Sequence, residues 1–272
     1  CIRDRSTCLS IVIGVPLAYV FSLYKIKGKS LLNILIIVAS MSAPFIGAYS
    51  WILLLGRSGV ITTFFKNMRI TIPDICGFGG IVLVMTLQLF PLVFLYAKGA
   101  LKNIDNSLLE ASSNLGCSGL KCFFKVVVPL IMPTLLAAAL LVFMRSFADF
   151  GTPMLIGEGY RTFPVVLYTE FINEVGGNDG FAAAIAVIAI VVTTVVFLAQ
   201  KYVSNRNSFS LNALHPMEEK EAKGPVKILV HLAAYVIVGI AILPQVYVTY
   251  TSFKNTEGKI FVSGYSLSSY AS

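Results

Sequence analysis

Charged side chains are scarce in this chain of 272 residues, and this scarcity limits the classes to which it can belong. Asp, Glu, Lys and Arg make up 12% of the residues, whereas an ordinary soluble domain carries roughly 25%. Hydrophobic residues make up 57%, and the mean hydropathy is +0.82. A soluble protein of this size cannot bury so much apolar surface, so the composition indicates a polytopic membrane protein.

The residue groupings that support catalysis or metal binding are also missing from the sequence. The 5 cysteines include no Cys-x-x-Cys pair, and His215 and His231 lie far from any cysteine along the chain. No Ser/His/Asp arrangement or pair of carboxylates falls at a predicted membrane surface. We therefore expect no catalytic residue, no metal ligand and no cofactor, and we interpret the cysteines as small apolar side chains.

Nucleic-acid and nucleotide binding have no support in the sequence either. The net charge is +8, but no basic patch alternates with exposed aromatic residues on a polar segment. Gly28-Lys29-Ser30 resembles the end of a P-loop, but Leu23 occupies the position that the motif reserves for its first glycine. We therefore predict that the chain does not bind nucleic acid and does not hydrolyse ATP itself.

Long apolar runs dominate the chain, and about 20 such residues span a bilayer as a helix. The candidate spans are residues 7–24, 31–55, 79–100, 126–148, 181–203 and 227–250. The second run is long enough to tilt or to break at Pro44, because proline cannot donate a backbone hydrogen bond. The predicted fold is an all-α membrane helix bundle with about six transmembrane helices in this fragment.

Lysine and arginine in the loops predict the orientation of the helices in the membrane. One side collects twelve: Lys25, Lys27, Lys29, Lys98, Lys102, Lys121, Lys125, Lys201, Arg206, Lys220, Lys223 and Lys227. The other side carries six: Arg57, Lys66, Arg69, Arg161, Lys254 and Lys259. We assign the first side to the cytoplasm, which places residues 101–125 there, and we expect the protein to lie in a cytoplasmic membrane.

The two ends of the chain and one polar stretch suggest how it is divided. Residues 1–5 put three charges at the start of a helix and resemble a translated sequencing adapter, so we expect a scar there. Residues 6–203 then form a first module that lacks its first helix. Residues 204–226 have the mixed-charge composition of a cytoplasmic linker. Residues 227–272 are expected to be the truncated start of a second module.

The polar segment 101–129 lies between two apolar spans and carries the most informative pattern. Asn103 or Asp105 can cap a helix that starts near Ile104, and Gly116 is suited to end it. We expect Leu108, Leu109 and Leu115 to anchor this helix to the bundle. The small side chains of Ala111, Ser112 and Ser113 would let another protein approach, and Glu110 would offer it one charge.

Glu110-Ala111-Ser112, with Gly116 six positions after Glu110 and Pro129 thirteen further on, resembles the EAA loop of membrane subunits of ATP-binding-cassette (ABC) importers. Ser112 replaces the third alanine of the pattern, and Val126-Val127-Val128 precedes Pro129 where the pattern has Ile-x-Leu. The resemblance implies a MetI-like permease fold. It also implies docking of a cytoplasmic ABC ATPase dimer on this loop and solute delivery by an extracytoplasmic binding protein.

A narrower resemblance concerns residues 146–171, SFADFGTPMLIGEGYRTFPVVLYTEF, which are followed by an alanine-rich run. This segment is similar to the ferric-iron permeases, which often fuse two modules in one chain. The resemblance implies iron(III) as the solute, with phosphonate, polyamine or sulfate-type anions as alternatives. A channel or secondary transporter without an ATPase stays open, but it would require ionisable groups inside the membrane.

Three polar residues near the predicted spans are candidates for a solute path or gate. Arg145 lies four positions before Asp149, so both occupy one helix face, either as gate residues or as an ion pair at a helix end. Gln88 lies beside Pro91 inside a span. It can line the path or form a hydrogen bond to a neighbouring helix.

Overall fold

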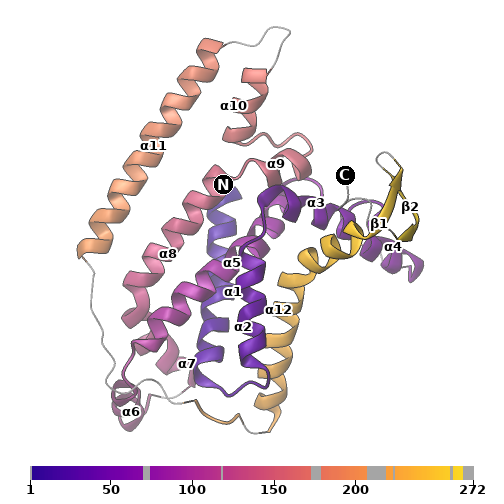
Figure 1. The fold of residues 1–272 in the computed structure, drawn as a ribbon. Helices are drawn as coiled ribbons and strands as arrows, with labels where there is room; N and C mark the ends of the chain where they lie inside the picture. Colours follow the sequence, from indigo (N-terminus) through magenta and orange to yellow (C-terminus); the bar gives the residue numbers. More distant parts are fainter. Residues whose placement is uncertain are drawn as a thin grey trace.

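The computed structural model describes residues 2–69, 74–117, 119–172, 179–206, 219–222, 224–257 and 260–265. It is an α-helical bundle with one short hairpin, drawn in Figure 1. The elements are α1 (Ile2–Leu23), α2 (Lys29–Ser40), α3 (Pro44–Leu55), α4 (Val60–Asn67), α5 (Phe78–Lys102), α6 (Asn106–Asn114), α7 (Gly119–Cys122), the π-helical turn η1 (Phe123–Val127), α8 (Val128–Ala148), α9 (Gly151–Ile156), α10 (Phe163–Ile172), α11 (Asp179–Arg206), α12 (Pro225–Ser252), β1 (Lys254–Glu257) and β2 (Ile260–Tyr265).

Six of the described segments are long and apolar enough to cross a membrane, which confirms the predicted fold class. They are Ile2–Leu23, Pro44–Asn67, Phe78–Lys102, Gly119–Ala148, Gly180–Ala199 and Pro225–Ser252. Helix α1 begins at Ile2, so residues 2–5, which we expected to be a scar, belong to this helix. The division at 204–226 stays a prediction, since residues 207–218 and 223 lie outside the described residues.

Helices α1 and α5 form the centre of the bundle, and a missing side chain lets them pack closely. A Cβ atom added at Gly14 of α1 would lie 2.9 Å from the Val93 Cβ of α5. Phe21 and Phe94 meet edge to face nearby, with ring centroids 5.1 Å apart. Both rings are fully buried. Helix α8 packs against both α1 and α5 and completes this core.

The second apolar run is two helices rather than one, which corrects the span predicted at 31–55. Helix α2 ends at Ser40, and α3 begins at Pro44. Ala43, at φ −67° and ψ 138°, is extended because a residue before proline avoids the α conformation. Each helix has 12 residues, or about 18 Å of length. Neither reaches across a bilayer core alone.

The two ends of the bundle carry different loops. In Figure 1, α6 and the connection between α1 and α2 lie at one end, and α9 and the β-hairpin lie towards the other. The α1–α2 turn also binds the stretch before α12, because Lys220 N donates to Leu23 O at 2.7 Å and Lys25 N donates to Lys220 O at 3.1 Å. The α1–α2 turn, α6 and the stretch before α12, which the charge count assigned to the cytoplasm, therefore lie at one end.

The two last helices cover the bundle unequally. Helix α12 packs along α2 and α3. Helix α11 stands apart from the core and contacts α8 and α10 (Figure 1). Only 6% of its most apolar window is buried. Its outward side chains therefore face lipid, or another subunit, rather than this bundle.

Candidate functional site

The loop between α5 and α8 contains a well-defined helix, α6. The Asp105 side chain accepts a hydrogen bond from Ser107 N at 3.0 Å, so Asp105 is the N-cap. The helix begins at Asn106, two residues after the predicted start at Ile104. Ile104 is instead fully buried, and it fixes the loop to the core that α1 and α5 form.

The end of α6 is also locked by backbone hydrogen bonds. Gly116 N donates to Ser113 O at 2.9 Å, and Cys117 N donates to Ser112 O at 3.0 Å. These two bonds define a Schellman motif, which requires a left-handed residue. Gly116 supplies it with φ +78°. The predicted role of Gly116 as the helix terminator is therefore confirmed.

The outer face of α6 presents Glu110 and Ala111, as expected, but not Ser112. The Ser112 Oγ lies 3.3 Å from the Cys122 Sγ and donates to Leu109 O at 2.8 Å. Two residues along a helix turn a side chain through about 200°. Ser112 thus points towards α7 when Glu110 points outwards, so Ser112 is not an approach surface.

The leucines of α6 also differ from the expectation that all three anchor the helix. Leu109 packs on the core. Leu108 is 41% exposed, and Leu115, at the C-cap where the chain turns away, is 89% exposed. Leu120 and Phe124 from the following turns are exposed as well. The loop surface therefore combines the Glu110 carboxylate with exposed apolar side chains.

The chain runs from α7 through η1 into α8 as one continuous rod. Val128 N donates to Phe123 O, five residues back. Pro129, which has no N–H to continue the α-helical pattern, follows at the start of α8 and is exposed. A force applied to α7 therefore reaches α8, and through it the core, and the contact between Ser112 and Cys122 links α6 to α7.

Gln88, the candidate path residue on α5, lies against the start of α3. A Cβ atom at Gly47 would lie 2.5 Å from the Gln88 Nε2, so a larger residue there would require the Gln88 side chain to move. That Nε2 atom is buried and has no hydrogen-bond partner among the described residues. The Gln88 nitrogen therefore makes no hydrogen bond to a neighbouring helix among the described residues, and the choice between a path residue and a helix-to-helix contact stays a prediction.

A second glutamine, which the sequence analysis missed, meets the other side of the α2–α3 break. Gln245 of α12 donates from Nε2 to Ala39 O at 3.3 Å, and its Oε1 is buried without a partner among the described residues. Its position beside Pro244 in an apolar helix was the available signal. The break thus has two membrane-embedded amides beside it, each with an unused polar atom.

Arg145 and Asp149 do not form the ion pair considered from their spacing. Arg145 is exposed. Asp149 lies beyond the last residue of α8 with ψ 113°, where the chain has left the helix. Its Oδ1 accepts from Thr152 N at 3.2 Å and caps α9. Burial raises the pKa of the Asp149 carboxyl above its ordinary value, against the lowering effect of the bonds from Thr152 and Gly151.

An ion-pair network at the opposite end from α6 was not predicted. The Arg57 Nε binds the Asp74 Oδ2 at 2.6 Å, and its Nη2 binds the Glu158 Oε1 at 2.8 Å. The bond from Arg57 is the main cause that lowers the pKa of Asp74. Ligand atoms of Asp74, Cys76 and Glu158 lie within 4.8 Å of one another. Because Arg57 binds both carboxylates, we interpret the group as a tie between loops.

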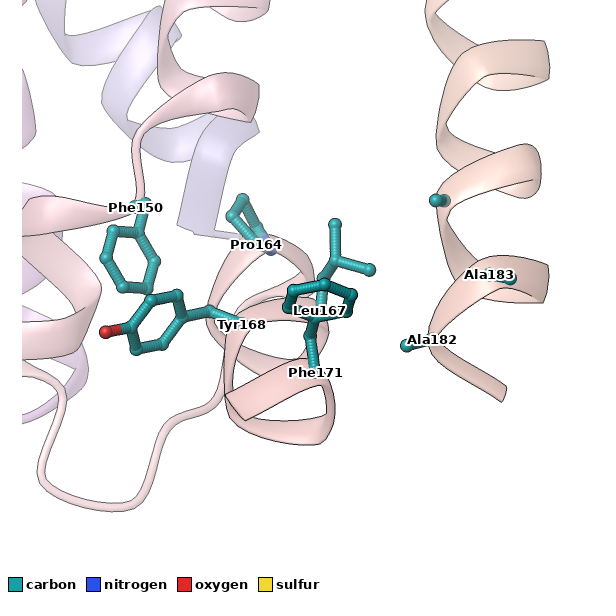
Figure 2. A pocket seen from close by; sticks show the side chains of 8 residues that line it. Phe150, Pro164, Leu167, Tyr168, Phe171, Ala182 and Ala183 are labelled. Carbon is teal, nitrogen blue, oxygen red and sulfur yellow. The ribbon is translucent and has the colours of Figure 1, made fainter. Parts of the chain in front are cut away.

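The space between α10 and α11 is a cavity of about 510 Å³. Figure 2 shows Phe150 and Tyr168 with their rings together on one side and the small side chains of α11 on the other. The two ring centroids are 4.7 Å apart. The residues that line the cavity are Phe150, Pro164, Leu167, Tyr168, Phe171, Ala182, Ala183 and Ala186. Such a surface suits acyl chains or a helix, not an ion or a polar solute.

A helical membrane bundle that exposes a rigid loop at its basic end has the architecture of a transport subunit. The family described as "Binding-protein-dependent transport system inner membrane component" matches residues 10–209. The chain belongs to this family, which places it in the inner membrane.

Individual relatives differ in the solute that their names carry. The chain is 27% identical to a putative ferric transport system permease protein, FbpB 1, of Haemophilus influenzae, over 75% of this chain and 32% of that protein. It is 26% identical to FbpB of Actinobacillus pleuropneumoniae, over 85% of this chain and 36% of that one. The chain therefore spans about a third of these two relatives. The molybdenum permease ModB of Haemophilus influenzae is 28% identical, over 72% of this chain and 86% of that protein.

The fold also has a solved counterpart. A chain in the structure titled "Inward facing conformations of the MetNI methionine ABC transporter" superimposes with a TM-score of 0.57. The match covers 76% of this chain and 92% of that chain at 16% identity. At this identity the likeness supports the predicted MetI-like fold and nothing finer.

Proposed function

We propose that the chain is part of the permease subunit of an ABC importer, which forms the membrane path for a solute while a separate ATPase supplies the energy. The observation that carries this proposal is the α6 loop. It is capped at both ends, directs Glu110 outwards and contacts α7, which continues into α8. The family match supports the same assignment.

The docking residues are Glu110, Ala111, Gly116 and Pro129, and Ser112 acts inside the loop. Glu110 and Ala111 are exposed on α6, where a groove of the ATPase can contact them. The exposed side chains of Leu115, Leu120 and Phe124 supply the apolar area of the contact. Ser112 holds α6 to α7, so the two short helices move together when an ATPase dimer closes.

The solute path is proposed to pass the break between α2 and α3. Non-helical backbone inside a membrane is stable only where protein or a water-filled cavity surrounds it. Gln88 and Gln245 lie at this break with unused amide atoms that a hydrated solute can satisfy. Arg145 and Asp149 lie at the end of α8 away from α6, where a binding protein would deliver the solute.

Iron(III) is the proposed solute, because two relatives over most of the chain carry ferric transport in their names. Molybdate and polyamines are the alternatives, since permeases named for molybdenum and for spermidine and putrescine match at similar identity.

We also propose that residues 6–203 form one permease module, residues 204–226 a linker and residues 227–272 the start of a second module. The greater length of the ferric relatives fits such a fusion.

Uptake of radiolabelled iron(III) by cells that express the permease, the binding protein and the ATPase tests this function. Uptake should require all three and should stop when the catalytic glutamate of the ATPase is replaced. Uptake that persists without the ATPase would show a secondary transporter or channel. Uptake of molybdate or spermidine but not of iron would change the solute and leave the importer mechanism standing.

A further inference from the structure

A basic cavity lies at the α6 end of the bundle, between α1, α2 and α5, separate from the docking loop. Its volume is about 360 Å³. Its lining residues are Phe21, Ser22, Lys29, Lys98, Leu101, Lys102 and Glu219. Phe21 and Leu101 are fully buried and form its apolar part. The other lining groups are polar, so the cavity has one apolar and one cationic part.

The charges in this cavity do not balance. Three lysines face one carboxylate, and the groups that act electrostatically on Lys98 are Lys29, Lys102 and Glu219. Lys98 is half-buried and donates at 2.6 Å to a neutral oxygen, the Asn33 Oδ1. A partly desolvated ammonium group is costly unless an anion faces it. The site therefore favours a second negative charge.

One anion already occupies part of the cavity. The Glu219 carboxylate, from the short described stretch before α12, binds the Lys29 Nζ. The Lys29 side chain is 20% exposed, and that of Glu219 is 41% exposed. Glu219 thus enters from the solvent side. Among the described residues, two backbone bonds of Lys220 and a 3.8 Å ion pair between Lys25 and Glu221 also hold the stretch to the α1–α2 turn. A stronger anion can displace it.

We propose that this cavity binds a phosphate group, supplied by an anionic phospholipid of the cytoplasmic leaflet or by a soluble phosphate, and that Glu219 competes with it for Lys29. The apolar wall of Phe21 and Leu101 suits the glycerol and first methylenes of a lipid. Helix α2 adds a favourable field, because Lys29 is its first residue and Gly28, the N-cap, gives it no side-chain cap. Displacement of Glu219 would remove one of the contacts between residues 219–222 and the bundle.

The test is a titration of the purified chain in neutral detergent with short-chain phosphatidylglycerol, with phosphatidylcholine and with inorganic phosphate, followed by native mass spectrometry. Phosphatidylglycerol should bind more tightly than phosphatidylcholine. Lys98→Gln and Lys29→Gln should each weaken its binding about fivefold, as expected for about 1 kcal/mol per lysine near a membrane surface. Glu219→Gln should tighten binding, an effect that damage to the fold cannot produce.

Lys27→Gln is the matched control, since Lys27 is exposed on the same turn and does not line the cavity. It should leave binding unchanged, and Lys98→Arg should retain most of it. Inorganic phosphate that binds with the same dependence on Lys98 and Glu219, while the lipid does not, would identify a soluble phosphate as the source. Equal loss in Lys27→Gln and Lys98→Gln, or unchanged binding in Glu219→Gln, would overturn the proposal.

Discussion

Charge reversal at Glu110 separates the docking role of α6 from a purely structural one. Glu110 is exposed, and the Asn106 Nδ2 one turn earlier donates to its Oε1 at 2.7 Å. Loss of such a pair costs a helix about 0.2–0.5 kcal/mol. Glu110→Lys should therefore leave the thermal unfolding of the chain almost unchanged.

At an interface the same change has a much larger effect. Removal of one partner from a desolvated charge pair costs about 2–5 kcal/mol, which corresponds to a loss of affinity between about thirtyfold and several thousandfold. We expect Glu110→Lys to abolish co-purification of the cognate ATPase and Glu110→Gln to reduce it by less.

Lys27→Glu supplies the control, because it reverses a charge on the exposed α1–α2 turn outside the loop. Its complex with the ATPase should persist. Undiminished co-purification of Glu110→Lys would refute the docking role of this carboxylate. Equal losses in both variants would mean that general charge, rather than α6, determines the association.

Three further predictions address the loop, the core and the orientation. Gly116→Val should destabilise the loop by about 1–2 kcal/mol because of its φ of +78°, whereas Gly116→Asn should be tolerated; equal co-purification of the ATPase by both variants would argue against this backbone requirement. Gly14→Val should separate α1 from α5 and lower the free energy of unfolding in detergent by about 1–3 kcal/mol. Gly99→Ala, where an added Cβ meets nothing within 4 Å, should leave it unchanged. In single-cysteine variants, Cys76 should react with an impermeant alkylating reagent in intact cells. Its reaction rate should rise about tenfold for each pH unit, because burial raises the pKa of the thiol to about 11 and only the thiolate reacts. Cys117 should react only after permeabilisation, and its labelling in intact cells would reverse the orientation.

The local pattern of the docking loop was predictable because its geometry depends on neighbouring residues. Asp105 and Gly116 act through bonds to atoms within a few positions, so a cap and a terminator can be recognised in the sequence. The inward direction of Ser112 was not predictable. It depends on Cys122, which reaches α6 only after the chain has turned through α7.

The proposed membrane path shows a similar division. The sequence offered Gln88 as a polar residue in an apolar span, and Pro44 as a place where a helix can break. That Gln88 lies against Gly47, and that Gln245 approaches the same break from α12, are consequences of packing between distant segments. The spacing of Arg145 and Asp149 was misleading, because the helix ends between them.

The sequence by itself determined the class of this protein: a basic, charge-poor chain with six apolar segments and one loop whose spacing identifies the importer family. Composition decides this because the bilayer admits long apolar helices and keeps charged loops outside. Only the tertiary structure decided which polar groups meet. The amides at the α2–α3 break, the Arg57 network and the lysine cavity each combine residues far apart in the chain, and packing between several helices brings them together.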